Sequence, residues 1–181
     1  MPNRTFDELE ALYTAGAPEP RDAGTVRLVC VRVGGGEHRT PERVAVTVAG
    51  GVEGDRWALD PERDTGEQVT LMSARVAKLI AADHAPLHAA GDNFLVELDL
   101  SVEALPVGTR LRLGTAELEI SEIPHTGCRK YAARFGHDAL KWANHVSTRG
   151  RRLRGVNARV VADGLVAVGD AIEVLRGPTI R

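Results

Sequence analysis

The chain has 181 residues, 43% of them hydrophobic, which is enough for one domain to bury a continuous core without disulfides or structural metals. Its net charge of -2 and pI of about 6.3 exclude an overall positive field that would attract nucleic acid or an anionic membrane. The two cysteines, far apart in sequence, exclude a disulfide framework and a structural zinc site, so a reducing, cytoplasmic setting is expected. Residues 1–11 carry three acidic side chains and no uninterrupted apolar stretch, which argues against a signal peptide or a membrane anchor.

Residues 1–24 are expected to form a short helix followed by a linker. Thr5 and Glu8 have the spacing of a capping box, apolar residues follow at helical intervals, and Gly16 is placed to end the helix. Residues 17–24 contain two prolines and no apolar period, which indicates a connecting segment.

Residues 25–177 are expected to form a single domain built mainly from short strands. Apolar alternation and valine-rich segments between glycine and aspartate turns predict strands at residues 25–33, 43–48, 94–98, 110–113, 116–120, 156–161, 165–168 and 171–175. Many short strands separated by tight turns favour a closed or partly closed β-barrel over an array of alternating strands and helices. The expected fold class is therefore mainly β.

A few short helices are expected as inserts between the strands. One begins after Ser73, which is suited to be its N-cap. Two more are predicted at residues 130–135 and 139–144, separated by Gly136, with Asp138 available to cap the second.

Positive charge is concentrated in one segment near the end of the chain, which holds Arg149, Arg151, Arg152 and Arg154. Without an overall positive field, an anionic ligand has to be bound by a local group of cations such as this one. A solvated loop is the other interpretation of the same pattern. Charge alone leaves both interpretations open.

The segment 125–130 places a thiol beside cations. Cys128 directly precedes Arg129 and Lys130, and it stands near the start of the predicted helix. Neighbouring cations and backbone N–H groups at a helix start both lower the pKa of a thiol. Cys128 is therefore the candidate reactive or metal-binding residue, whereas Cys30 lies among valines in a predicted strand and is expected to be structural.

A thiol enzyme is one interpretation of this segment. His125 stands three residues before Cys128 and is a possible general base. Such an enzyme would catalyse an alkylation-sensitive hydrolysis without a metal. No catalytic-cysteine signature surrounds the pair, and a small buried hydrophobic cysteine is a second interpretation.

Several segments together resemble the MOSC domain, a family named from the C-terminal domain of molybdenum cofactor sulfurases. They are Gly51-Val52-Glu53-Gly54-Asp55-Arg56-Trp57, Glu67-Gln68-Val69-Thr70-Leu71-Met72-Ser73, Gly91-Asp92-Asn93-Phe94, His125-Thr126-Gly127-Cys128, Arg154-Gly155-Val156-Asn157-Ala158-Arg159-Val160, Gly164 and Val168-Gly169-Asp170. These segments are distributed over roughly residues 25–175, and chance agreement of several in order is much rarer than a match to one short motif.

The resemblance implies a mostly β barrel of the pyruvate-kinase type that binds a molybdenum cofactor. In the family the cysteine is the metal ligand, a role that falls on Cys128, and a soft thiolate suits a metal that already holds two pterin sulfurs. The residues expected to hold the pterin and its phosphate are Asp55, Arg56, Thr70, Ser73, Asn93, His125, Arg129, Lys130, Arg154 and Asn157. A turn explains Asp55 and a helix cap explains Ser73 equally well, and Trp57 either lines the cleft or packs in the core.

Two functions are expected from the resemblance. The first is a molybdenum-dependent oxidoreductase that reduces small N-hydroxylated or related substrates, with electrons from a separate donor because the sequence has no flavin, haem or iron–sulfur motif. The second is a sulfur carrier or cofactor-delivery module with a persulfide at Cys128, served by a cysteine desulfurase. Pyridoxal phosphate is not expected to bind this domain itself. The expected partners are therefore molybdopterin, a small-molecule substrate and one such protein, not nucleic acid or a membrane.

Overall fold

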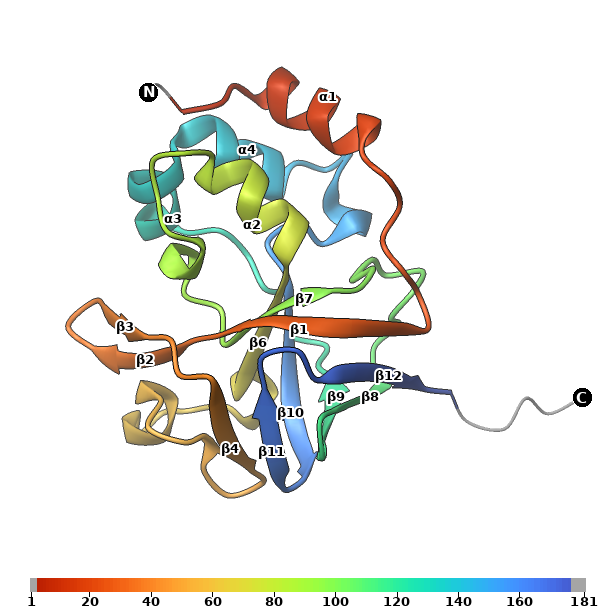
Figure 1. The fold of residues 1–181 in the computed structure, drawn as a ribbon. Helices are drawn as coiled ribbons and strands as arrows, with labels where there is room; N and C mark the ends of the chain where they lie inside the picture. The colour runs from red at the N-terminus through yellow and green to blue at the C-terminus, as the bar shows by residue number, and fades with distance from the viewer. Residues whose placement is uncertain (1–2, 177–181) are drawn as a thin grey trace, which may run out of the picture.

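The computed structural model describes residues 3–176, so residues 1–2 and 177 of the predicted segments lie outside it. Seven strands close into a barrel in the order β1–β12–β8–β9–β10–β6–β7 (Figure 1). Their bounds are β1 Ala23–Val29, β6 Val69–Ser73, β7 Phe94–Glu97, β8 Arg110–Leu113, β9 Ala116–Ile120, β10 Val156–Ala162 and β12 Ala171–Leu175. Neighbouring strands are antiparallel except for the parallel pair β6 and β7. The prediction of a mainly β fold with a closed barrel is confirmed.

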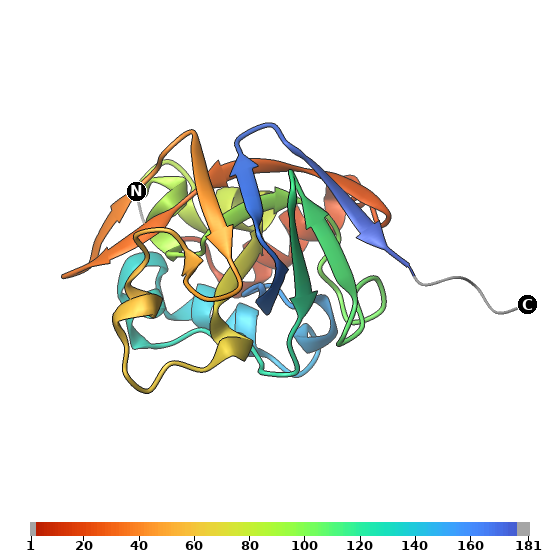
Figure 2. The same ribbon diagram turned by 90° about the horizontal axis from the view of Figure 1, so that it is seen from below.

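Two small sheets accompany the barrel. One contains β11 Gly164–Ala167, β4 Arg43–Thr47 and β5 Gly51–Val52, and the other is a ribbon of β2 Val31–Gly34 and β3 Glu37–Arg39. The ribbon extends away from the barrel to one side (Figure 2). The single strand predicted over residues 25–33 is therefore two strands that meet at Cys30, because the chain leaves its pairing with β7 there and continues into the ribbon.

The helices lie together on one side of the barrel, with α1 outermost (Figure 1). They are α1 Phe6–Ala15, α2 Ala74–Ala81, α3 Arg129–Phe135 and α4 His137–Asn144. Four single turns are also present, η1 Arg56–Leu59, η2 Thr65–Glu67, η3 Leu87–Ala90 and η4 Arg149–Arg151, and η1 and η2 lie at the other end of the molecule, beside β4 (Figure 1). None of the helices within residues 3–176 has the length and apolar character needed to cross a membrane.

The predicted helix caps are confirmed at two of three positions. Thr5 and Glu8 form the capping box of α1, and the Ser73 hydroxyl accepts from the backbone N–H of Val76 at the start of α2. The prediction that Asp138 caps α4 is wrong. Gly136 has a φ of 91°, a conformation that favours glycine, so α4 begins at His137 and Asp138 falls inside its first turn.

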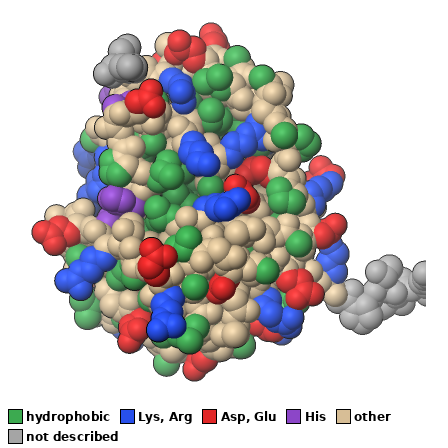
Figure 3. All heavy atoms as spheres, in the orientation of Figure 1, with side chains coloured by type: hydrophobic (Ala, Val, Ile, Leu, Met, Phe, Trp, Pro, Cys, Tyr) green, Lys and Arg blue, Asp and Glu red, His purple; other side chains and the backbone are tan. Residues whose placement is uncertain are grey.

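Two hydrophobic clusters hold the fold together. The first fills the barrel with aliphatic side chains and Phe94. The second lies between the helices and the outside of the barrel and includes Trp142 of α4 and Leu9 of α1, both with 0% exposure. Helix α1 is therefore packed into the body of the protein. On the face drawn in Figure 3, basic and acidic side chains are interspersed, so charge on this face would not select an anionic ligand.

Candidate functional site

A cavity of about 700 Å³ lies where the loop after β9 meets the arginine-rich segment around η4. Its wall includes Ile123, His125, Gly127, Arg149, Arg152 and Arg154. A volume of this size suits a small molecule or a cofactor. We call it the first cavity.

A second cavity of about 510 Å³ lies beside η1. Arg32, Arg56, Trp57 and Thr70 contribute to its wall. Trp57 is also only 9% exposed, so it both lines a cavity and belongs to the core. His125 and Asn157 line both cavities, which identifies this pair of residues as the partition between them.

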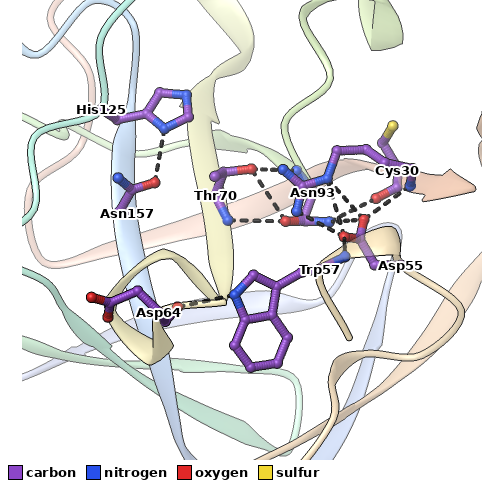
Figure 4. A network of polar contacts seen from close by, with 9 residues as sticks. Cys30, Asp55, Trp57, Asp64, Thr70, Asn93, His125 and Asn157 are labelled. Carbon is purple, nitrogen blue, oxygen red and sulfur yellow. Dashed lines mark hydrogen bonds and ion pairs between the residues drawn. The ribbon is translucent and has the colours of Figure 1, made fainter. Parts of the chain in front are cut away.

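The partition is held by hydrogen bonds. The Asn157 side-chain amide donates to the backbone carbonyl of Ile123 at 3.2 Å, which turns its Oδ1 toward His125 Nδ1 at 2.8 Å (Figure 4). The His125 ring must therefore carry its proton on Nδ1 and donate it to Asn157. His125 Nε2 lies 3.2 Å from Asp92 Oδ1, in a contact without the alignment of a hydrogen bond.

A buried ion pair stands directly behind the partition. The Asp92 side chain is 0% exposed, and both of its oxygens accept from Arg154 Nη1, at 2.7 and 2.6 Å. Arg154 also donates to the carbonyl of Ala90 at 3.2 Å and lies over the ring of Tyr131. Burial alone would raise the pKa of Asp92, but the charge of Arg154, together with the contact with His125 and the hydrogen bonds from Arg154, outweighs it and holds that pKa below its ordinary value.

A second polar network lies beneath the second cavity. Asn93 is fully buried, and its Oδ1 accepts from the backbone N–H of Thr70 at 3.0 Å (Figure 4). Its Nδ2 donates to the carbonyl of Cys30 at 3.2 Å and to Asp55 Oδ2 at 2.9 Å. The side chain of Asn93 is thus fully hydrogen-bonded inside the protein, where it joins the junction of β1 and β2, strand β6 and the loop before η1.

Asp55 is an internal anchor of the same network. It accepts from the guanidinium of Arg32 at 2.8 Å and from the backbone N–H of Trp57 at 2.9 Å, the contact that caps η1. Burial raises its pKa, but the hydrogen bonds and charge of Arg32 outweigh this and lower the pKa overall. Asp55 and Asn93 line neither cavity and act by fixing the residues that do.

Cys128 is exposed and directly precedes α3, next to Gly127 of the first cavity. Its pKa is lowered chiefly by the backbone N–H group of Tyr131, then by that of Lys130 and by the charge of Arg154, against a smaller opposing effect of burial. Neither N–H group makes a regular capping hydrogen bond to the sulfur. No hydrogen bond joins Cys128 to His125 within residues 3–176, so the thiol-enzyme interpretation gains no support from this geometry.

Iodoacetamide is expected to modify Cys128 and spare Cys30 in the native protein. Cys30 is 0% exposed, and burial raises the pKa of its thiol to about 12, whereas the pKa of Cys128 is lowered. Because the thiolate is the reacting form, the rate at Cys128 should stay high at a pH where an ordinary cysteine, with a pKa of about 8.5, has become protonated. Peptide mapping after timed labelling across pH gives both rates. Equal labelling of the two cysteines, or a midpoint at or above about 8.5, would contradict this expectation.

Besides Asp55 and Asn93, three more of the predicted cofactor-binding residues line neither cavity. Ser73 caps α2 and donates its hydroxyl to Glu19 at 2.6 Å. Arg129 and Lys130 are exposed on the first turn of α3, beside Cys128. The cations in the wall of the first cavity are instead those of the segment from Arg149 to Arg154.

Two residues of the site were not predicted from the sequence. Asp92 is the partner of Arg154, and Arg32 is the partner of Asp55. Asp92 directly follows Gly91 before the buried strand β7, and an acidic residue at such a position needs a cationic partner. The position of Asp92 in the sequence therefore predicts a cationic partner, but it does not identify which arginine provides the charge.

Comparison with known proteins identifies relatives of this arrangement. The family model of the MOSC domain matches residues 64–173, more than half of the chain. No curated protein matches this chain.

Solved structures of similar fold cover most of the chain. YuaD from Bacillus subtilis is 20% identical, with a TM-score of 0.59, over 87% of this chain and 98% of its own. YiiM from Geobacillus stearothermophilus is 18% identical, with a TM-score of 0.59, over 87% and 77%, and YiiM from Escherichia coli is 17% identical, with a TM-score of 0.56, over 84% and 70%. At these identities the structures establish the fold alone. The match over residues 64–173 shows that this chain belongs to the MOSC domain family, and the closed barrel agrees with it.

Proposed function

We propose that this MOSC protein binds the molybdenum cofactor through Cys128 and acts as an oxidoreductase on small molecules, with N-hydroxylated compounds as the expected class. The observation that carries the proposal is the thiol itself. Cys128 is exposed rather than sealed in the core, its pKa is lowered, and its neighbour Gly127 lines a cavity of about 700 Å³.

The residues around this cavity suit the cofactor. A thiolate is a soft ligand, as a metal with sulfur ligands requires. Arg149 and Arg152 offer guanidinium groups to the phosphate of the pterin, and Arg154 adds a third. When bound, the cofactor would supply the two-electron redox chemistry, and the protein would supply position and charge.

The protein's own groups would orient what binds. Asp92 holds the guanidinium of Arg154, and Asn157 holds the ring of His125, so both side chains are positioned by the protein before any ligand binds. The second cavity lies on the other side of that partition and has the size of a small-molecule site. We assign it to the substrate. Electrons would come from a separate donor protein.

Metal analysis tests the proposal. Protein produced with added molybdate should contain molybdenum and pterin in amounts close to one per chain. Cys128→Ser should lower the molybdenum content about tenfold or more, because a hydroxyl is a poor ligand for this metal. Cys30→Ser is the matched control and should retain the metal, since Cys30 is buried and lines neither cavity. A metal-free wild-type protein would refute the proposal.

A sulfur carrier is the second candidate, because the same exposed thiol is what a persulfide requires. In that case incubation with a cysteine desulfurase and cysteine should add one sulfur atom at Cys128, detected by mass spectrometry. Turnover of an N-hydroxylated substrate by the molybdenum-loaded protein without such an adduct would favour the oxidoreductase.

A further inference from the structure

We infer that the N-terminal helix α1 is part of the site, and that Glu10 positions the arginines of the first cavity by holding Arg151. That the first cavity binds an anionic phosphate group rests on the proposed function. The contact between Glu10 and Arg151 does not depend on that function. Helix α1 lies outside residues 64–173, the part of the chain that the family model matches.

Glu10 joins three elements of the fold. Its two carboxylate oxygens both accept from Arg151 Nη1, each at 2.8 Å. Its Oε2 also accepts from the indole N–H of Trp142 at 2.9 Å, which ties α1 to α4. The guanidinium of Arg151 lies over the ring of Tyr13, 5.3 Å from its centre, so α1 holds this arginine by charge and by stacking.

Arg151 contacts a different part of the protein from the other arginines of the same segment. Arg149, Arg152 and Arg154 line the first cavity, while Arg151 contacts α1. Arg151 is therefore the arginine through which α1 holds this segment.

The backbone of this segment is strained. Arg152 has a φ of 49°, and within residues 3–176 only Ala82 shares a positive φ among residues other than glycine. Such a conformation persists only where the surroundings impose it. The segment is held by Glu10 through Arg151, by Asp92 through Arg154, and by Arg152 itself, whose Nη1 donates to the backbone carbonyl of Leu105 at 2.6 Å. Release of the contact with Glu10 should loosen the backbone around Arg152 and weaken its position in the cavity wall.

The variants Glu10→Gln and Arg151→Gln test the inference. Glutamine at position 10 keeps an oxygen for Trp142 but loses the charge that holds Arg151, so α1 stays docked. Amide hydrogen exchange of residues 149–155 is measured on the ligand-free protein and on its complex with inorganic pyrophosphate. Calorimetry gives the affinity of each variant for pyrophosphate.

In each variant the amides of Arg151, Arg152 and Gly155, which are hydrogen-bonded within the segment, should exchange about tenfold faster than in wild type. Pyrophosphate should bind about three- to tenfold more weakly, and the double variant should be no worse than either single one. Glu97→Gln removes a similarly exposed ion pair with Arg27 elsewhere on the surface and should change neither quantity.

Wild-type exchange and affinity in Glu10→Gln would overturn the inference, as would faster exchange spread evenly over the whole chain. A wild-type protein that binds no pyrophosphate would overturn the assignment of an anion to the first cavity. The outcomes separate this inference from the proposed function. A loosened segment in a protein that holds no molybdenum leaves the inference standing and removes the proposed function, whereas a molybdenum-loaded Glu10→Gln protein with a rigid segment does the reverse.

Discussion

Replacing Asp92 by asparagine is expected to lower the free energy of unfolding by about 3–5 kcal/mol. The asparagine has nearly the same shape, so the loss reports the charge rather than packing. It leaves the guanidinium of Arg154, a 9% exposed residue, without its anionic partner. Urea denaturation of the wild type and the variant gives the difference, provided that the two slopes agree.

The matched control is Glu97→Gln, which breaks an exposed pair with Arg27 and should cost no more than about 1 kcal/mol. The effect of Asp92 should also depend on pH. Because the pKa of Asp92 is lower in the folded than in the unfolded state, its stabilisation is present at neutral pH and is lost as the pH falls through the folded value. The difference between wild type and Asp92→Asn should therefore shrink in acid. A loss at neutral pH no larger than in the control would show that Arg154 finds another partner.

The barrel could be predicted because its signals are local. Short alternating strands and glycine–aspartate turns gave most of the strands of the closed ring, and the Thr5 and Glu8 pair gave the start of α1. The errors arose where a tertiary contact decides the outcome. The division at Cys30 depends on which partner each half of the strand pairs with, β7 or β3, and the alternation of residues along the chain is the same in both cases.

The candidate site was predicted in part. His125, Arg154 and Asn157, expected from the resemblance, do line the first cavity together. Asp92 was missed as a site residue because its partner Arg154 is 62 positions away, and no pattern along the chain connects them. Glu10 was missed for the same reason, since its partner Arg151 is 141 positions away. The resemblance thus predicted residues that line the cavities and two internal anchors, Asp55 and Asn93, but not the anchors Asp92 and Glu10, whose partners are distant in sequence.

Replacing Gly155 by alanine is expected to cost at least about 3 kcal/mol of the free energy of unfolding. Gly155 has a φ of 104°, and a Cβ atom there would lie 2.1 Å from the backbone carbonyl oxygen of Leu71. Backbone atoms of β6 cannot rotate away, so β10 would have to shift against β6 where Val156 pairs with Leu71. That shift would reach Arg154 and Asn157, which flank this point of the chain, so binding in the first cavity should weaken as well.

Gly169→Ala separates the two causes of this cost. Gly169 has a φ of 90°, but no atom lies within 4 Å of the Cβ that would be added, so its replacement costs backbone strain alone, about 1–2 kcal/mol. The excess loss in Gly155→Ala over Gly169→Ala, measured by urea denaturation, is then the steric cost of moving β10. Pyrophosphate affinity should fall only in Gly155→Ala, because Gly169 lies in the turn before β12 and lines neither cavity. Equal losses of stability in the two variants, with unchanged affinity, would contradict a steric cost at Gly155 and a shift of β10 against β6.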